Sequence, residues 1–222
     1  MRDINTEEEE QAEQVTESSA EENLDLDKEE KAENKWSAIV KELLVYAIII
    51  VVCVMVVPRY VIQRTEVDGG SMMNTLQNEE NLLVEKCVWR VTGLKRYDIV
   101  TFYPEGRDTI DPKTGEPKYY IKRIIGLPGE TVQVVGDVVY INGKVLDDKK
   151  YKEEYDMSDG FGDGGIAEEP ITLKDDEYFV MGDHRGISED SRSSAVGPVK
   201  RENIDGRVAL RIYPFSEFGT VE

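Results

Sequence analysis

Several residue types that build enzyme sites and cross-linked folds are scarce in this chain. Among its 222 residues there are two cysteines and one histidine, too few to fill a structural zinc site. Cys53 lies within a long apolar run and Cys87 lies well beyond it, so no disulfide between them is expected. A histidine acting as a catalytic base would have to be His184. The sequence therefore implies no metal and no cofactor.

Positive charge is scarce as well. Lys and Arg number 27 against 46 Asp and Glu, a formal net charge of −19, which argues against the basic face that a nucleic-acid partner requires. Residues 1–35 alone hold 14 acidic and four basic residues, a net charge of −10. Such a segment buries too little apolar surface to offset its ordering entropy. We expect residues 1–35 to form a disordered cytoplasmic tail.

One long apolar run follows the acidic segment. Leu43–Val57 holds no charged residue and would span about 22 Å as a helix, against a hydrocarbon core of about 30 Å. Extension to Ile62 lengthens the helix, with Trp36 and Arg59 near the two interfaces. We therefore expect a transmembrane signal-anchor helix within residues 36–62. A buried core helix is disfavoured because the run is apolar on every face, and a cleaved signal because no small-x-small site follows it.

Basic residues flank this run unequally. Cytoplasmic flanks of membrane segments are enriched in Lys and Arg, whatever the local net charge. Four lysines precede the run and two arginines follow it: Lys28, Lys31, Lys35, Lys41, Arg59 and Arg64. The sequence therefore predicts a single-pass protein of the cell membrane, with a cytoplasmic N-terminus and an extracytoplasmic domain over residues 63–222.

Beyond residue 62 the apolar pattern changes to the period of β-strands. Short runs of β-branched and aromatic residues are separated by Gly, Pro and Asp, and the Asn142-Gly143 pair predicts a tight hairpin. No long amphipathic helix is evident, so we expect a mainly β domain with antiparallel pairing. The expected strands are Asn81–Cys87, Asp98–Tyr103, Tyr119–Ile125, Thr131–Val135, Asp137–Ile141, Glu177–Met181 and Arg207–Tyr213.

Residues 151–170 form a glycine-rich acidic segment. As a calcium loop beginning at Asp159, it would place Phe161 and Pro170 at positions that need oxygen ligands. A surface loop is therefore the favoured interpretation.

Two segments carry residue types that point to chemistry. A serine hydroxyl needs a base within hydrogen-bond reach to act as a nucleophile. Ser71 opens the segment Ser71–Leu76 (SMMNTL), and Lys122 follows 51 residues later within Tyr120–Arg123 (YIKR). The β-branched and aromatic neighbours of Lys122 favour burial, which helps to remove its proton. Together with the apolar run, the pair suggests a membrane-tethered serine protease.

Four segments resemble the sequence boxes of the bacterial type I signal peptidases, in order and spacing. Val67–Leu76 resembles the nucleophile box, Arg96–Val100 the Arg-Gly-Asp-Ile-Val strand, and Tyr120–Glu130 the lysine box. Gly182–Arg192 resembles the Gly-Asp-Asn-Arg-x-x-Ser-x-Asp-Ser-Arg box, and the whole resemblance covers roughly residues 36–215. It implies an antiparallel β-sheet catalytic domain of the signal-peptidase type, preceded by one transmembrane helix.

The resemblance implies roles for individual residues. Ser71 is similar to the nucleophile, Lys122 to the general base and Ser188 to the hydroxyl that orients the lysine amine. The backbone N–H of Ser71 resembles one oxyanion-hole donor, and Gly69, expected to border the substrate, stands where some members have a serine as the second donor. The resemblance also implies an ion pair between Asp190 and Arg192, with Asp183 and Arg185 positioning the same turn. It implies that the walls of shallow substrate pockets are formed by Val67, Met72, Leu76, Tyr120 and Ile121.

The activity that the resemblance implies is removal of signal peptides from secreted preproteins after Ala-x-Ala-like sites. Its implied partners are those signal peptides, membrane lipid and, by proximity, the secretion translocon. Four residues depart from the family boxes: Asn74 replaces proline, Tyr97 glycine, His184 asparagine and Ala195 glycine. None of the four is a residue of the implied dyad, and they fit a specialised paralogue.

Two other functions fit parts of the sequence. A self-cleaving regulator with a serine–lysine dyad, as in the bacterial SOS repressors, would need an Ala-Gly or Cys-Gly site before the serine, and residues 1–70 contain neither. A non-enzymatic membrane adaptor built on a decayed peptidase has only the four departures in its favour. His184 stands where asparagine supports the structure of its box, so a structural hydrogen bond is favoured over catalysis.

Overall fold

The computed structural model describes residues 36, 39–73, 75–105, 115, 119–151 and 164–221. It divides into two compact units, one up to Val56 and one from Val57 onward. The predicted acidic tail, Asn74 and most of the predicted acidic loop lie outside the described residues.

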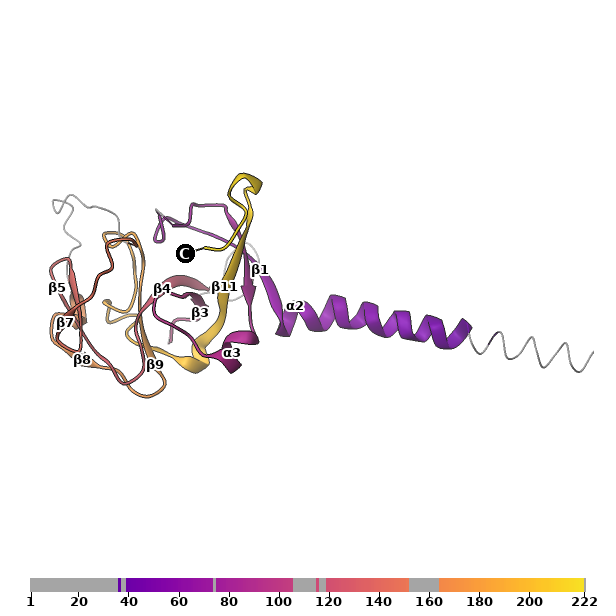
Figure 1. The fold of residues 1–222 in the computed structure, drawn as a ribbon, viewed down its shortest axis with the longest axis horizontal. Helices are drawn as coiled ribbons and strands as arrows, with labels where there is room; N and C mark the ends of the chain where they lie inside the picture. Colours follow the sequence, from indigo (N-terminus) through magenta and orange to yellow (C-terminus); the bar gives the residue numbers. More distant parts are fainter. Residues whose placement is uncertain are drawn as a thin grey trace, which may run out of the picture. The chain divides into compact units, whose positions relative to one another are not determined.

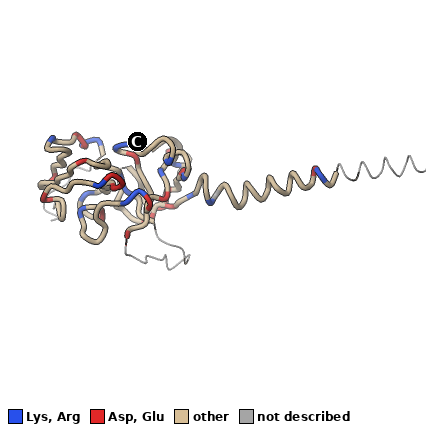
Figure 2. The backbone as a smooth tube through the Cα atoms, turned by 90° about the horizontal axis from the view of Figure 1, so that it is seen from below, with Lys and Arg blue, Asp and Glu red and all other residues tan. Residues whose placement is uncertain are grey.

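The first unit contains the helix Ile39–Val56, which ends in a π-helical turn, η1 (Val52–Val56). The helix has 18 residues and is long and apolar enough to cross a membrane. None of its surface is buried inside the protein. In Figure 2 the helix is tan along most of its length, because Lys41 and Glu42 are its only charged residues. At 1.5 Å per residue it rises about 27 Å, close to the thickness of a hydrocarbon core. The helix is therefore a candidate membrane span.

The second unit begins with a helical turn, α2 (Val57–Tyr60), and passes almost directly into β1 (Ile62–Glu66). Apolar length alone predicted a helix up to Ile62, and this boundary is corrected, because Ile62 is already the first residue of β1. The strand was not predicted. It pairs with its neighbour from Ile62 opposite Glu85 to Glu66 opposite Asn81. Backbone hydrogen bonds to another strand therefore replace helical ones from this point.

The described strands form two sheets in which every pair is antiparallel (Figure 1). The larger sheet has the order β1-β2-β11-β3-β4-β9-β10, and the smaller has the order β7-β6-β5-β8. The remaining bounds are β2 (Asn81–Glu85), β3 (Ile99–Phe102), β4 (Tyr120–Gly126), β5 (Thr131–Val135), β6 (Val138–Ile141), β7 (Lys144–Val145), β8 (Ile171–Thr172), β9 (Glu177–Met181), β10 (Val199–Lys200) and β11 (Ile204–Tyr213).

All seven predicted strand regions contain strands, which confirms the mainly β, antiparallel domain. β5 and β9 have the predicted bounds. Asn142 and Gly143 join β6 to β7 with φ values of 52° and 75°, the left-handed conformation that a tight hairpin requires. The strands β7, β8 and β10 were missed because two residues are too few to show alternation.

One of three buried apolar clusters connects the segment after Ser71 to the larger sheet. Met72 and Leu76 share this cluster with Ile99 of β3 and Ile121 of β4. The turn that carries Ser71 is thereby packed against the strand that carries Lys122. Short helices complete the domain: α3 (Val88–Thr92), η3 (Gly165–Ala167), η4 (Arg201–Asn203) and η5 (Phe215–Glu217).

Candidate active site

Ser71 and Lys122, 51 residues apart in the sequence, are hydrogen-bonded in the structure. Ser71 lies in the turn after β1 and Lys122 is the third residue of β4. The Lys122 Nζ lies 2.7 Å from the Ser71 Oγ and 3.0 Å from the carbonyl oxygen of Ile121. An amine at this distance is within reach of the hydroxyl proton, provided that the amine is neutral.

Burial favours that neutral form. Lys122 is 4% exposed, and desolvation lowers its pKa from 10.5 to about 8, although nearby carboxylates, foremost Asp190 and Glu189, act in the opposite direction. With a pKa of about 8, roughly a tenth of the amines are neutral at pH 7, against fewer than one in a thousand for a free lysine.

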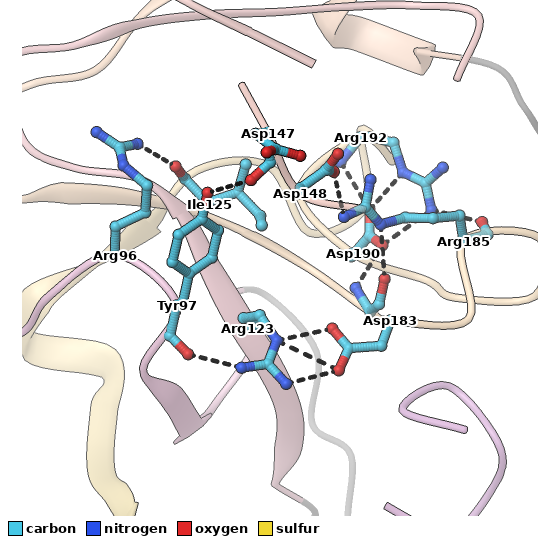
Figure 3. A network of polar contacts seen from close by, with 11 residues as sticks. Arg96, Tyr97, Arg123, Ile125, Asp147, Asp148, Asp183, Arg185, Asp190 and Arg192 are labelled. Atoms are coloured by element: carbon cyan, nitrogen blue, oxygen red, sulfur yellow. Dashed lines mark hydrogen bonds and ion pairs between the residues drawn. The ribbon is translucent and has the colours of Figure 1, made fainter. Parts of the chain in front are cut away.

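Two of the carboxylates near Lys122 are paired with arginines (Figure 3). Asp190 accepts hydrogen bonds from Arg192, with its Oδ1 2.9 Å from the Nε, and its Oδ2 accepts from the N–H of Gly182. Burial alone would raise the pKa of Asp190, but the hydrogen bonds and charge of Arg192 hold it below its ordinary value. Asp183 is paired with Arg123, each side chain 1% exposed. The arginines therefore weaken the pull of both carboxylates on the lysine proton.

Arg185 and Asp183, which belong to the same predicted turn, form side-chain ion pairs with other residues. The Arg185 guanidinium binds Asp148, with 2.7 Å between Nη2 and Oδ2, and donates from Nε to the carbonyl oxygen of Gly182. Arg192 in turn donates to the carbonyl oxygen of Arg185 at 2.7 Å. The two arginines thus hold the main chain of this turn at two points, Gly182 and Arg185.

The same turn supports the main chain of Ser71. The N–H of His184 donates to the Ser71 carbonyl oxygen at 3.1 Å, a contact that any residue type except proline could supply. Ser188 Oγ is buried against Gly182 and lies near enough to Asp190 to help lower the pKa of that carboxyl. Among the described residues it has no hydrogen bond of normal geometry, so the structure places no bond between Ser188 and Lys122.

Gly182 allows the close approach of these groups. An alanine Cβ at this position would lie 2.2 Å from Ser188 Oγ and 2.4 Å from the Ser71 carbonyl oxygen. We expect Gly182→Ala to lower kcat/KM for a peptide substrate at least tenfold, because backbone atoms next to Ser71 must move. Gly70→Ala is the matched comparison, since its Cβ would meet the flexible end of Met73 and should cost less activity. Equal losses in the two variants would contradict this role of Gly182.

Of the six residues implied to line the substrate (the five pocket walls and Gly69), most are buried. Val67, Met72, Leu76 and Ile121 belong to one apolar cluster, and Ile121 is the most exposed of them at 8%. Tyr120 is half-buried, and Gly69 is exposed with a φ of +99°. The structure therefore brings four of the six together beside the serine and the lysine, and their contact with substrate stays a prediction.

Arg123 was missed as a candidate residue. Besides binding Asp183, its guanidinium donates to the carbonyl oxygen of Tyr97 at 2.8 Å and to Thr75 Oγ1 at 3.2 Å. Thr75 Oγ1 also donates to Asp183, so the network joins the Ser71 turn, β4 and the 182–192 turn. The available signal was a charged residue, next to Lys122, inside a strand whose other residues predict burial.

The chain is similar in sequence to a family of known peptidases. Residues 40–213 match the family model described as signal peptidase, peptidase S26. Signal peptidase I of Bacillus amyloliquefaciens is 35% identical over 198 residues, covering 86% of this chain and 97% of that protein. Signal peptidase I S of Bacillus subtilis (strain 168) is 35% identical over 179 residues, covering 77% and 87%. A crystal structure of a signal peptidase I from Enterococcus faecalis V583 is 29% identical, covers 51% of this chain and 95% of its own, and has a TM-score of 0.33. The chain belongs to the signal peptidase family, peptidase S26, and is a serine peptidase.

Proposed function

We propose that this protein removes signal peptides from exported preproteins at the membrane, with Ser71 as nucleophile and Lys122 as general base. The observation that carries the proposal is the 2.7 Å contact between Ser71 Oγ and a buried Lys122 amine whose pKa is lowered to about 8. Membership of the signal peptidase family and the apolar helix Ile39–Val56 support the substrate class and the location.

In this mechanism the Lys122 amine accepts the hydroxyl proton as Ser71 Oγ attacks the carbonyl carbon of the scissile bond. The oxyanion that forms is stabilised by the backbone N–H of Ser71. Lys122 then gives the proton to the leaving amine, the C–N bond breaks, and an acyl-enzyme remains on Ser71. A water molecule, deprotonated by the same amine, attacks the ester carbonyl carbon. The bond from that carbon to Ser71 Oγ breaks, Lys122 returns the proton to Oγ, and the signal peptide leaves with a free carboxylate.

The polar network around the pair serves positioning in this scheme. The main-chain bond from His184 to Ser71 and the Arg123–Asp183–Thr75 contacts fix the turn that carries the nucleophile. Because small misplacements of reacting groups cost large factors in rate, such a rigid support favours catalysis.

Labelling of the serine tests the proposal directly. We expect a fluorophosphonate probe, whose phosphorus is attacked by activated serines with loss of fluoride, to add one adduct to the full-length protein in detergent. Peptide mapping should place the adduct on Ser71, and Ser71→Ala should abolish both labelling and preprotein cleavage. Cleavage that persisted in Ser71→Ala would overturn the assignment.

Substrate range gives a second prediction. The small apolar set around Ser71 should accept alanine-sized side chains at the first and third residues before the cut. We expect Ala-x-Ala peptides to be cleaved at least about a hundredfold faster than Phe-x-Phe peptides, since a side chain that cannot enter its pocket costs several kcal/mol. Equal kcat/KM values for the two peptides would contradict this substrate range.

Membrane orientation gives a third prediction. We propose a single-pass protein of the cell membrane whose N-terminus is cytoplasmic and whose domain from residue 63 onward meets lipid and preproteins emerging from the translocon. Protease added to intact spheroplasts should digest the domain and spare an epitope placed within residues 1–35. Digestion of the epitope with survival of the domain would reverse the orientation.

A further inference from the structure

Glu189 belongs to the 182–192 turn and lies close enough to Lys122 for its charge to act on that amine. Its two neighbours are directed inward. Ser188 is packed against Gly182, and Asp190, which is 0% exposed, is bound by Arg192. Glu189 itself is exposed. The main chain on both sides of Glu189 is therefore held in place, while its side chain is exposed to solvent.

Its contact with Tyr120 places this carboxylate close to the lysine. Tyr120 Oη donates to Glu189 Oε2 at 3.3 Å, and the Lys122 Nζ lies 5.4 Å from the centroid of the Tyr120 ring. One aromatic ring therefore separates the carboxylate from the amine. A peptide in extended conformation advances about 3.3 Å per residue, so several residues around a scissile bond held at Ser71 come within range of Glu189.

The charges facing Lys122 differ in their surroundings. Asp190 and Asp183 are buried, and each is bound by an arginine, Arg192 and Arg123. Glu189 is exposed to solvent. Its charge raises the pKa of Lys122, in the same direction as the charges of Asp190 and Asp183 and against that of Arg192. A carboxylate at this place thus stabilises the protonated form of the Lys122 amine.

We propose that Glu189 is a specificity-determining residue, which favours substrates with Lys or Arg within a few residues of the scissile bond and disfavours Asp or Glu there. This inference rests on the proposed function and names a property of its substrates. The physical basis is the potential of a fixed carboxylate, which attracts a cationic side chain and repels an anionic one in the same bound geometry. When the two charges are partly solvated and several ångströms apart, this attraction or repulsion changes binding by a factor of about five to ten.

The test uses one Ala-x-Ala peptide in which Lys, Gln or Glu replaces each residue in turn, from four before the cut to four after it. With full-length protein in detergent, we expect kcat/KM for Lys to exceed that for Glu about fivefold or more at one or more positions. Glu189→Gln should bring that ratio to about one, and Glu189→Lys should invert it. Glu202→Gln, which removes the charge of another exposed glutamate, on η4, should leave the wild-type ratio unchanged.

The pH dependence supplies a readout that a purely structural role would not move. Removal of the Glu189 charge lowers the pKa of Lys122, so the rise of kcat/KM with pH should shift to lower pH in Glu189→Gln. The inference is overturned if the ratio of kcat/KM for the Lys peptide to that for the Glu peptide is the same in wild type and in Glu189→Gln at every position scanned, about four on each side of the cut. Failure of the proposed function gives a different result, because the wild-type protein would then leave the neutral Gln peptides uncut and its Ser71 would stay unlabelled.

Discussion

Lys122→Arg and Lys122→Ala are both expected to lower kcat/KM for an Ala-x-Ala peptide by about 10²- to 10⁴-fold, the range that general bases contribute. Arginine keeps the positive charge and much of the length of lysine, but its guanidinium stays protonated at any pH that the protein survives. It therefore cannot accept the hydroxyl proton of Ser71 across the 2.7 Å contact. Single-turnover cleavage of the peptide, followed by mass spectrometry, measures the loss.

The pH profile of the wild-type enzyme belongs to the same prediction. Only the neutral amine is a base, and burial lowers its pKa to about 8. We expect kcat/KM to rise with pH from 6 through about 8 and to level off above it. If His184→Ala abolished cleavage while Lys122→Ala retained it, the base would be the histidine and the mechanism would be wrong.

A stability measurement separates loss of the base from loss of the fold. The folded lysine has a pKa near 8 and the unfolded one near 10.5, so the unfolded chain binds more protons between these values. Stability from this group therefore rises with pH from 8 to 10.5, and below pH 8 the full cost of burying the charge is present. Lys122→Met removes that cost, so at pH 7 it should be inactive yet more stable by up to about 3 kcal/mol. Urea unfolding at pH 7 checks this.

Local sequence patterns predicted most of the sheet. Short runs of β-branched and aromatic residues bounded by turn formers located β5 and β9 at their observed ends, and Asn142-Gly143 marked a hairpin through its tolerance of positive φ. β1 was missed because Ile62–Glu66 (IQRTE) follows the apolar run directly and has one apolar residue, Ile62, so that only pairing with β2 makes it a strand. Pairing partners are a property of the whole chain, which local patterns do not contain.

The candidate site, like the sheet, could be predicted from the sequence only in part. Ser71 and Lys122 could be proposed from residue types and box spacing, because a serine nucleophile needs a nearby base. Neither the partner of Arg185, which is Asp148, nor the main-chain role of His184 could be read from the boxes. Asp148 lies between the resembling segments, and a backbone N–H has no residue signature. Long-range polar partners of this kind become evident only once the strands are assembled.

The Arg123–Asp183 pair should be the largest single contributor to the integrity of the site. Both side chains are 1% exposed, and the guanidinium binds both carboxylate oxygens. Arg123→Met would leave the carboxylate buried without its cation, which typically costs 3–5 kcal/mol. We expect the free energy of unfolding to fall by about that amount in urea titrations followed by the fluorescence of buried Trp89.

A double variant distinguishes a broken pair from a lost contact. Arg123→Met with Asp183→Leu removes both charges, and apolar replacements of buried pairs are often neutral or stabilising, so much of the lost stability should return. Activity should not return with it, because the Thr75 hydroxyl then loses both of its side-chain partners, which support the Ser71 turn. Lys200→Met breaks the exposed pair with Glu105 and should leave the unfolding midpoint unchanged. An equally small effect of Arg123→Met would show that the buried pair does not hold the site together.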